Sequence, residues 1–134
     1  MRKKILIVED DVLLVKAISY EFEQENFEVF TAGDGVDGLA MAEQHLPDLI
    51  LADILMPKMD GLVMLKKLRD REGGKKIKFI ILTNVNSSDK IAEAMDLQEV
   101  VTDGYFEYFI KADIELEEIV KKINALASLS QDMR

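Results

Sequence analysis

The chain lacks the residues that most often build covalent or metal-centred chemistry. Its 134 residues contain no cysteine and a single histidine, His45. The absence of cysteine excludes disulfides, thiolate nucleophiles and thiolate metal sites. One histidine is too few for a multi-histidine zinc site. A cysteine-free chain is compatible with a reducing compartment, and we expect a cytoplasmic protein.

Positive charge is also scarce. Lysine and arginine number 17 against 26 acidic residues, so the formal net charge is −9. Such an acidic field repels phosphate backbones and anionic membranes, so we expect this domain to bind neither nucleic acid nor membrane. No apolar run approaches the length that spans a bilayer. The length is that of one domain with a sizeable core.

Short aliphatic runs alternate with longer amphipathic stretches along the chain. Continuous apolar runs predict strands buried on both faces at residues 5–8, 27–31, 49–52, 77–82 and 105–110. Apolar residues at helical spacing predict helices at about 12–24, 35–46, 62–69, 89–97 and 114–126, with Asp11 and Asp113 as caps. Lysines 75, 76 and 78 predict a solvated turn before the fourth strand. The alternation predicts (βα)5, a doubly wound five-stranded parallel sheet in a flavodoxin-like three-layer α/β sandwich.

Polar residues directly follow four of the predicted strands. They are Glu9, Asp10 and Asp11 after the first strand, Asp53 after the third, Thr83 after the fourth and Lys111 after the fifth. Ligands of parallel α/β sheets bind beyond the carboxyl ends of the strands, so we expect these side chains to lie together. Any one acid alone is better explained as a helix cap, and Asp11 fits that role. Four polar strand ends together favour a functional site.

These residue types suit phosphoryl transfer. Carboxylates that lie together need a cation to offset their repulsion, and Mg²⁺ favours a few carboxylates plus water. With Mg²⁺ on Glu9 and Asp10, the Asp53 carboxylate can attack a phosphoryl group and form an acyl phosphate. Lys111 can neutralise the phosphoryl oxygens, and Thr83 can donate a hydrogen bond to them.

The same residues stand in motifs that resemble the receiver domain of response regulators in two-component signalling. The motifs are ILIVEDD at 5–11, LILADILMPKMDG at 49–61, ILT at 81–83 and YFIK at 108–111. The resemblance covers nearly the whole chain. It implies a receiver domain at 1–128, similar to single-domain chemotaxis regulators, followed by a short polar tail at 129–134.

The resemblance implies a metal site and a phosphoacceptor. Glu9 and Asp10 would bind Mg²⁺ (or Mn²⁺), with Asp53 and the backbone carbonyl of Leu55 completing the ligands. Asp53 would accept a phosphoryl group from a histidine kinase or a phosphotransfer protein. The domain would then be a phosphoacceptor switch and not an enzyme, although it takes part in its own phosphorylation and dephosphorylation.

The resemblance also implies how the switch works. Thr83 and Lys111 would contact the phosphoryl group, and Thr83 would move toward it while the aromatic ring of Tyr108 turns inward. The surface of the fourth helix, fifth strand and fifth helix would then change its affinity for a downstream protein or a second copy of the chain.

The chain departs from the family pattern at several positions. Ala112 stands where the family usually has a proline after the lysine, and we expect the Lys111–Ala112 bond to keep the family's cis form. Asn84 replaces a smaller residue and is expected to narrow access to the site. Leu55 and Val85 are apolar and cannot orient a water, which predicts a slowly hydrolysing acyl phosphate. Extra residues at 97–103 predict a longer helix or a surface loop.

The main alternative is a degenerate receiver that acts as a phosphorylation-independent interaction module. The departures from the family pattern at Ala112 and Asn84 are compatible with this alternative, whereas the intact set of site residues argues against it. A dehalogenase-type phosphatase needs a second aspartate at position 55, where the chain has leucine. A flavin-binding module needs a glycine- and hydroxyl-rich loop where residues 9–11 are acidic. A Ser–His–Asp hydrolase has no nucleophile motif here, and we expect His45 to be an exposed helix end.

Overall fold

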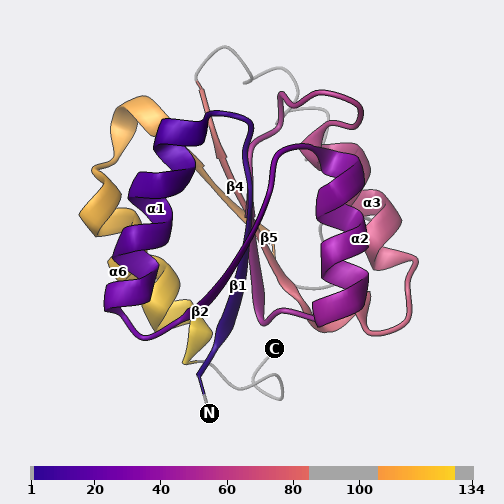
Figure 1. Cartoon of the computed structure of the whole chain (residues 1–134), viewed down its shortest axis with the longest axis horizontal. Helices are drawn as coiled ribbons and strands as arrows, with labels where there is room; N and C mark the ends of the chain where they lie inside the picture. The colour runs from indigo at the N-terminus through magenta and orange to yellow at the C-terminus, as the bar shows by residue number, and fades with distance from the viewer. Residues whose placement is uncertain (1, 85–105, 129–134) are drawn as a thin grey trace.

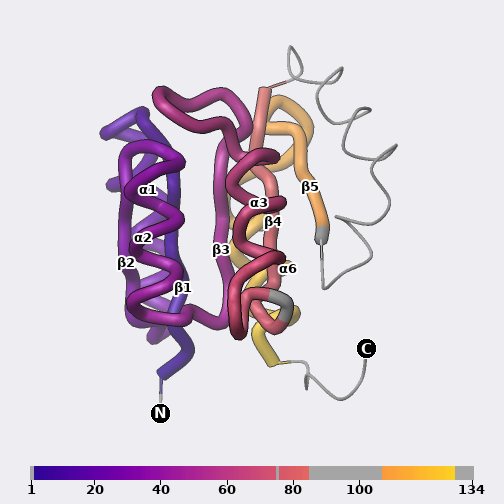
Figure 2. The backbone as a smooth tube through the Cα atoms, turned by 90° about the vertical axis from the view of Figure 1, so that its right-hand side faces the viewer, coloured from indigo at the N-terminus to yellow at the C-terminus, as the bar shows by residue number. Residues whose placement is uncertain are grey.

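Five parallel strands form one sheet in the computed structural model, which describes residues 2–84 and 106–128. The strands are β1 (Lys4–Val8), β2 (Glu28–Ala32), β3 (Leu49–Ala52), β4 (Lys78–Thr83) and β5 (Phe106–Ile110). Their order across the sheet is β2-β1-β3-β4-β5, as Figure 2 shows, and each neighbouring pair is parallel. The predicted doubly wound sheet is therefore confirmed.

Helices cover both faces of the sheet. In the described residues they are α1 (Val12–Gln24), α2 (Gly35–His45), α3 (Gly61–Arg69) and α6 (Leu116–Ala127). Helices α1 and α6 lie on one face, and α2 and α3 lie on the other (Figure 1). None of these helices is long and apolar enough to cross a bilayer. The predicted helix at 89–97, the extra residues at 97–103, Val85 and the tail at 129–134 lie outside the described part of the chain.

The strands are mostly apolar because each one contributes to two cores. In β1, Ile5 and Ile7 face the core under α1 and α6, while Leu6 and Val8 face the core under α2 and α3. All four side chains are at most 1 % exposed. Successive side chains of a strand point to opposite faces, so covering both faces removes any polar alternation.

Aspartates fix the start of the helices that follow the first three strands. Asp11 caps α1, Asp34 caps α2 and Asp60 caps α3, each accepting backbone N–H groups at 2.8–3.2 Å. These side chains satisfy donors that the first helical turn leaves without a partner. The predicted cap at Asp11 is confirmed.

The segment after β5 differs from the prediction in two ways. The Lys111–Ala112 peptide bond is trans, so the expected cis bond is wrong. Lys111–Asp113 form a short 3₁₀ helix, and α6 begins after Glu115, so Asp113 does not cap it. Alanine at 112 lacks the ring that makes cis accessible to proline, so the chain takes the trans bond and turns before α6 begins.

A buried arginine holds the turn between α3 and β4. Arg69 is 3 % exposed, and its Nη1 donates hydrogen bonds to the carbonyls of Gly74 and Ile77 at 2.8 and 2.7 Å. The turn is tight, because a Cβ at Gly74 would collide with the carbonyl of Leu68. The predicted solvated turn is wrong for Lys78, which is buried because β4 already begins there and pairs with β3.

Replacing Arg69 with methionine should destabilise the fold, because it removes two buried hydrogen bonds from a charged donor. We expect the free energy of unfolding in urea to fall by about 2–4 kcal/mol. Arg71→Met is the matched control, since Arg71 is half exposed in a 3.1 Å ion pair with Glu43. The control should lose less than about 1 kcal/mol. Equal losses for the two variants would contradict the anchoring role.

Candidate functional site

The carboxyl ends of the strands bring the predicted site residues together at one edge of the sheet, at the top of Figure 1. Glu9, Asp53 and Thr83 are buried, at 5 %, 6 % and 0 % exposed. Lys111 is half-buried, and Asp10 is exposed. All five residues therefore lie where the sequence predicted them.

The carboxylate of Asp53 lies between a hydroxyl and an ammonium group. Thr83 Oγ1 donates a hydrogen bond to Oδ1 at 3.0 Å, and Lys111 Nζ donates one to Oδ2 at 3.2 Å. Thr83 ends β4, which pairs with β3, and Lys111 follows β5, which pairs with β4. The glycine at 61 fits closely behind Asp53, since a Cβ there would collide with the Asp53 carbonyl.

Lys111 also binds Glu9. Its Nζ lies 3.0 Å from Glu9 Oε1, and Glu9 Oε2 accepts the Asp11 N–H at 3.2 Å. Burial raises the pKa of Glu9, although its hydrogen bonds to Lys111 and Asp11 partly offset this. Burial lowers the pKa of Lys111, but the hydrogen bond to Glu9 and the charges of Asp53 and Glu9 outweigh it. The net pKa of Lys111 is therefore raised, and its side chain stays a cation at neutral pH.

The acidic residues fit a divalent cation. One carboxylate oxygen each from Glu9, Asp10 and Asp53 lies within 4.8 Å of the other two. Three negative charges against the single positive charge of Lys111 leave the cluster net negative. Oxygen donors of this kind suit Mg²⁺, which binds a few carboxylates and keeps several waters. Leu55 lies two residues after Asp53, in the loop that follows β3.

The loop that carries Leu55 is closed by a hydrogen bond between its two ends and held by an ion pair from Lys58 within it. The Gly61 N–H donates to the Ile54 carbonyl at 2.9 Å. Lys58 has a left-handed backbone with φ of 68°, and its Nζ lies 3.4 Å from Asp34 Oδ2. The hydrogen bond from the Asp37 N–H, assisted by Lys58, holds the pKa of Asp34 below its usual value. The sequence does not predict this ion pair, because nothing in the pattern links the two loops.

Tyr108 and Phe109 of β5 lie on opposite faces of the sheet. Tyr108 pairs with Ile81 of β4 and lies half-buried against the core under α2 and α3. Phe109 lies against the other core. The switch role of Tyr108 stays a prediction. Asn84 is exposed just after β4, so its side chain does not fill the buried part of the site.

His45 differs from its prediction. It ends α2 as expected, but its ring is half-buried and stacks on Phe30 of β2, with 4.2 Å between ring centroids. His45 lies at the C-terminal end of α2, away from the acidic edge, whereas Asp34 caps the other end of this helix. His45 therefore has a packing role, and no hydrolase triad forms around it in the described residues.

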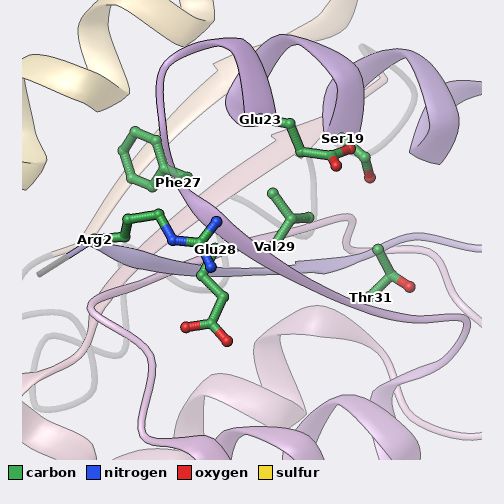
Figure 3. Close-up of a pocket in the computed structure, with 7 residues that line it drawn as sticks. All are labelled: Arg2, Ser19, Glu23, Phe27, Glu28, Val29 and Thr31. Atoms are coloured by element: carbon green, nitrogen blue, oxygen red, sulfur yellow. The ribbon is translucent and has the colours of Figure 1, made fainter.

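A hollow also lies along the edge strand β2. Figure 3 shows the residues that line it, which are Arg2, Ser19, Glu23, Phe27, Glu28, Val29 and Thr31. None of them belongs to the predicted site. The hollow holds the charged residues Arg2, Glu23 and Glu28, but the carboxylate cluster lies at the carboxyl edge of the sheet.

Comparison with known proteins agrees with the geometry. Residues 5–124 match the family described as the response regulator receiver domain. The chain belongs to this family. It is therefore a signal-transduction domain of the two-component type.

Curated relatives include two bacterial regulators. The alkaline phosphatase synthesis transcriptional regulatory protein PhoP of Bacillus subtilis (strain 168) is 36 % identical over 105 residues, which cover 78 % of this chain and 42 % of PhoP. The response regulator ArlR of Staphylococcus aureus (strain Mu50 / ATCC 700699) is 34 % identical over 123 residues, covering 92 % of this chain and 52 % of ArlR. The chain spans about half the length of these relatives.

Solved receiver domains share the fold. The chemotaxis response regulator CheY4 of Vibrio cholerae superposes with a TM-score of 0.79 at 26 % identity, covering 94 % of this chain and 99 % of that one. A CheY-like receiver domain protein from Methanospirillum hungatei JF-1 gives a TM-score of 0.79 at 26 % identity, covering 99 % and 98 %.

The pKa of Asp34 predicts a pH-dependent contribution to stability. Because the pKa is lower in the folded chain, ionised Asp34 stabilises the fold fully above its ordinary pKa of about 4. This contribution is lost as the pH falls through the lower folded value. Asp34→Asn should therefore be less stable than the wild type at pH near 7, and the two should converge in acid when urea unfolding is measured across pH.

Asp70→Asn is the control for this experiment, because Asp70 is exposed at the C-terminal end of α3. It should show no such convergence. A stability difference between Asp34→Asn and the wild type that stays constant with pH would contradict the electrostatic explanation.

Proposed function

We propose that the chain is a phosphoryl-accepting switch of a two-component phosphorelay, with Asp53 as the acceptor. One observation carries the proposal: the Asp53 carboxylate lies between the Thr83 hydroxyl and the Lys111 ammonium, beside the carboxylates of Glu9 and Asp10. A helix cap needs none of these neighbours, whereas an acceptor of a phosphoryl group needs all of them.

In the proposed reaction, a carboxylate oxygen of Asp53 attacks the phosphorus of a phosphohistidine. The new P–O bond forms as the P–N bond of the donor breaks, and the histidine leaves with the electron pair. Lys111 neutralises the phosphoryl oxygens and Thr83 donates a hydrogen bond to one of them. The donor is a histidine kinase or a phosphotransfer protein.

The carboxylates of Glu9, Asp10 and Asp53, with the carbonyl of Leu55, would hold Mg²⁺ (or Mn²⁺). When bound, the ion supplies the positive charge that stabilises the transferring phosphoryl group. Glu9 and Asp10 take no other part in the reaction. They place two negative charges next to Asp53, and only a cation can balance these charges.

The switch begins from a hydroxyl that already contacts the acceptor. Thr83 then moves toward the new phosphoryl oxygens. The ring of Tyr108, which lies on the neighbouring strand, turns inward. The surface formed by β5, α6 and the helix predicted at 89–97 then changes its affinity for a downstream protein or a second copy of the chain. The domain acts in the cytoplasm as a switch and turns over only its own acyl phosphate.

A small phosphodonor tests the acceptor role. Incubation with acetyl phosphate and Mg²⁺ should add the mass of one phosphoryl group to the intact chain, because Asp53 is the poised nucleophile. Asp53→Asn should show no adduct, and Asp70→Asn, which removes an exposed carboxylate elsewhere, should keep it. A wild-type chain without an adduct would favour the alternative, a phosphorylation-independent interaction module.

The side chain at position 55 should set the lifetime of the acyl phosphate. Leu55 is 50 % exposed and apolar, so it cannot orient a water toward the phosphorus. We expect hydrolysis over minutes or longer when phosphorylated protein is followed by mass after removal of the donor. Leu55→Asn should shorten the lifetime several-fold, whereas Leu55→Met should not. A wild-type lifetime of seconds would overturn the prediction.

A further inference from the structure

The start of α2 is fastened to the loop that follows β3. One carboxylate makes both contacts with separate oxygens: Asp34 Oδ1 accepts the Asp37 N–H at 2.8 Å, and Asp34 Oδ2 lies 3.4 Å from Lys58 Nζ. The side chain of Asp34 is only 11 % exposed, so its position is fixed by the fold, whereas that of Lys58 is 64 % exposed. The residue that caps one helix therefore also holds the loop that leads into the next.

The backbone at Lys58 is strained. Its φ of 68° lies in the left-handed region, which glycine adopts readily and lysine does not. Across this residue the Met59 N–H donates to the Pro57 carbonyl at 2.7 Å. A hydrogen bond over three residues with a positive central φ is a rare and strained γ-turn. Such backbone persists only where the surrounding structure holds it, and it is common at functional sites.

The structure that holds this turn belongs to α2. A Cβ at Gly35 would collide with the Met59 carbonyl, so glycine at this position lets the first turn of α2 lie directly against the strained turn. Met59 also packs against the core under α2 and α3. The Asp34–Lys58 ion pair is the polar part of the same contact, and it fixes the strained residue itself.

A shift of the turn would reach the proposed phosphoacceptor. The loop closes where the Gly61 N–H donates to the carbonyl of Ile54, a fully buried residue that directly follows Asp53. Gly61 also lies against the carbonyl of Asp53, where a Cβ would collide. Close-packed atoms transmit strain, so the conformation at Lys58 and the position of the Asp53 backbone are linked through these contacts.

We propose that Asp34 and Lys58 form a latch that positions the loop at 53–61 for phosphoryl transfer. The inference rests on the proposed function, in which Asp53 is the acceptor. Both residues act through the loop and not by contact with the phosphoryl group, so they are positioning residues. Opening the latch lets the turn leave its strained conformation, and Asp53 then spends less time in the position from which it attacks.

Phosphorylation of the full chain by acetyl phosphate with Mg²⁺, followed by intact mass over time, tests the latch. Lys58→Met removes the ammonium group, and Asp34→Asn removes the negative charge but keeps an oxygen for the α2 cap. Each variant should lower the maximal rate about two- to fivefold, as expected for a partly exposed ion pair. The donor concentration at half-maximal rate should not change. The double variant should be no slower than either single variant, because both substitutions open one latch.

Lys67→Met is the matched control, because it removes the same charge from an exposed position on α3. It should keep the wild-type rate, and Lys58→Arg, which retains the positive charge, should recover most of it. A wild-type rate in Lys58→Met, or losses that multiply in the double variant, would overturn the latch. A raised half-maximal donor concentration in Lys58→Met would also overturn it, since Lys58 would then be binding the donor.

Amide hydrogen exchange of the unphosphorylated chain gives a readout that needs no phosphoryl transfer. The N–H groups of Met59 and Gly61 close the turn and the loop. They should exchange several-fold faster in Lys58→Met and Asp34→Asn than in the wild type, because the latch opposes local opening. Unchanged exchange would overturn the latch even if both variants react slowly. Failure of the proposed function is distinct: the wild type would then form no adduct, although exchange would still respond to both substitutions.

Discussion

Repulsion among the carboxylates of Glu9, Asp10 and Asp53 is the constraint on which the rest of this site depends. Two of these groups are buried, so their charges cannot be left to water and must be balanced by the protein or by a bound cation. The protein supplies Lys111, which is 102 positions from Glu9 in the sequence. Lys111 can balance these charges only when β5 has joined the sheet, because it directly follows that strand. The site and the complete fold therefore require each other.

Most of the fold is readable from the sequence because it rests on local patterns. Continuous aliphatic runs such as 5–8 indicate strands covered on both faces, and α1 begins after the predicted cap Asp11 and ends at Gln24, as expected. The site residues are readable for a geometric reason. Parallel strands end at one edge, so a polar residue after each apolar run must face the others.

The features that the sequence does not reveal are pairings between distant segments or choices of the backbone. Lys78 continues a basic cluster in the sequence, yet it is buried because β4 begins there and pairs with β3. The ion pair of Lys58 with Asp34 joins two loops with no shared motif. The bond before Ala112 is trans, and Lys111 still reaches both carboxylates, so the reach of its long side chain removes the need for a special backbone.

The two cores give the molecule a mechanical asymmetry. Thr83 lies two positions after Ile81 and so shares its face of β4, the face toward α2 and α3, where Tyr108 of β5 also lies. The opposite core, which contains Ile18, Phe22 and Ile123, has no part in that face. Close-packed interiors have low compressibility and transmit strain between side chains that are in contact. A displacement of Thr83 toward the acceptor would thus be felt first on the face of the sheet that it shares with Ile81 and Tyr108.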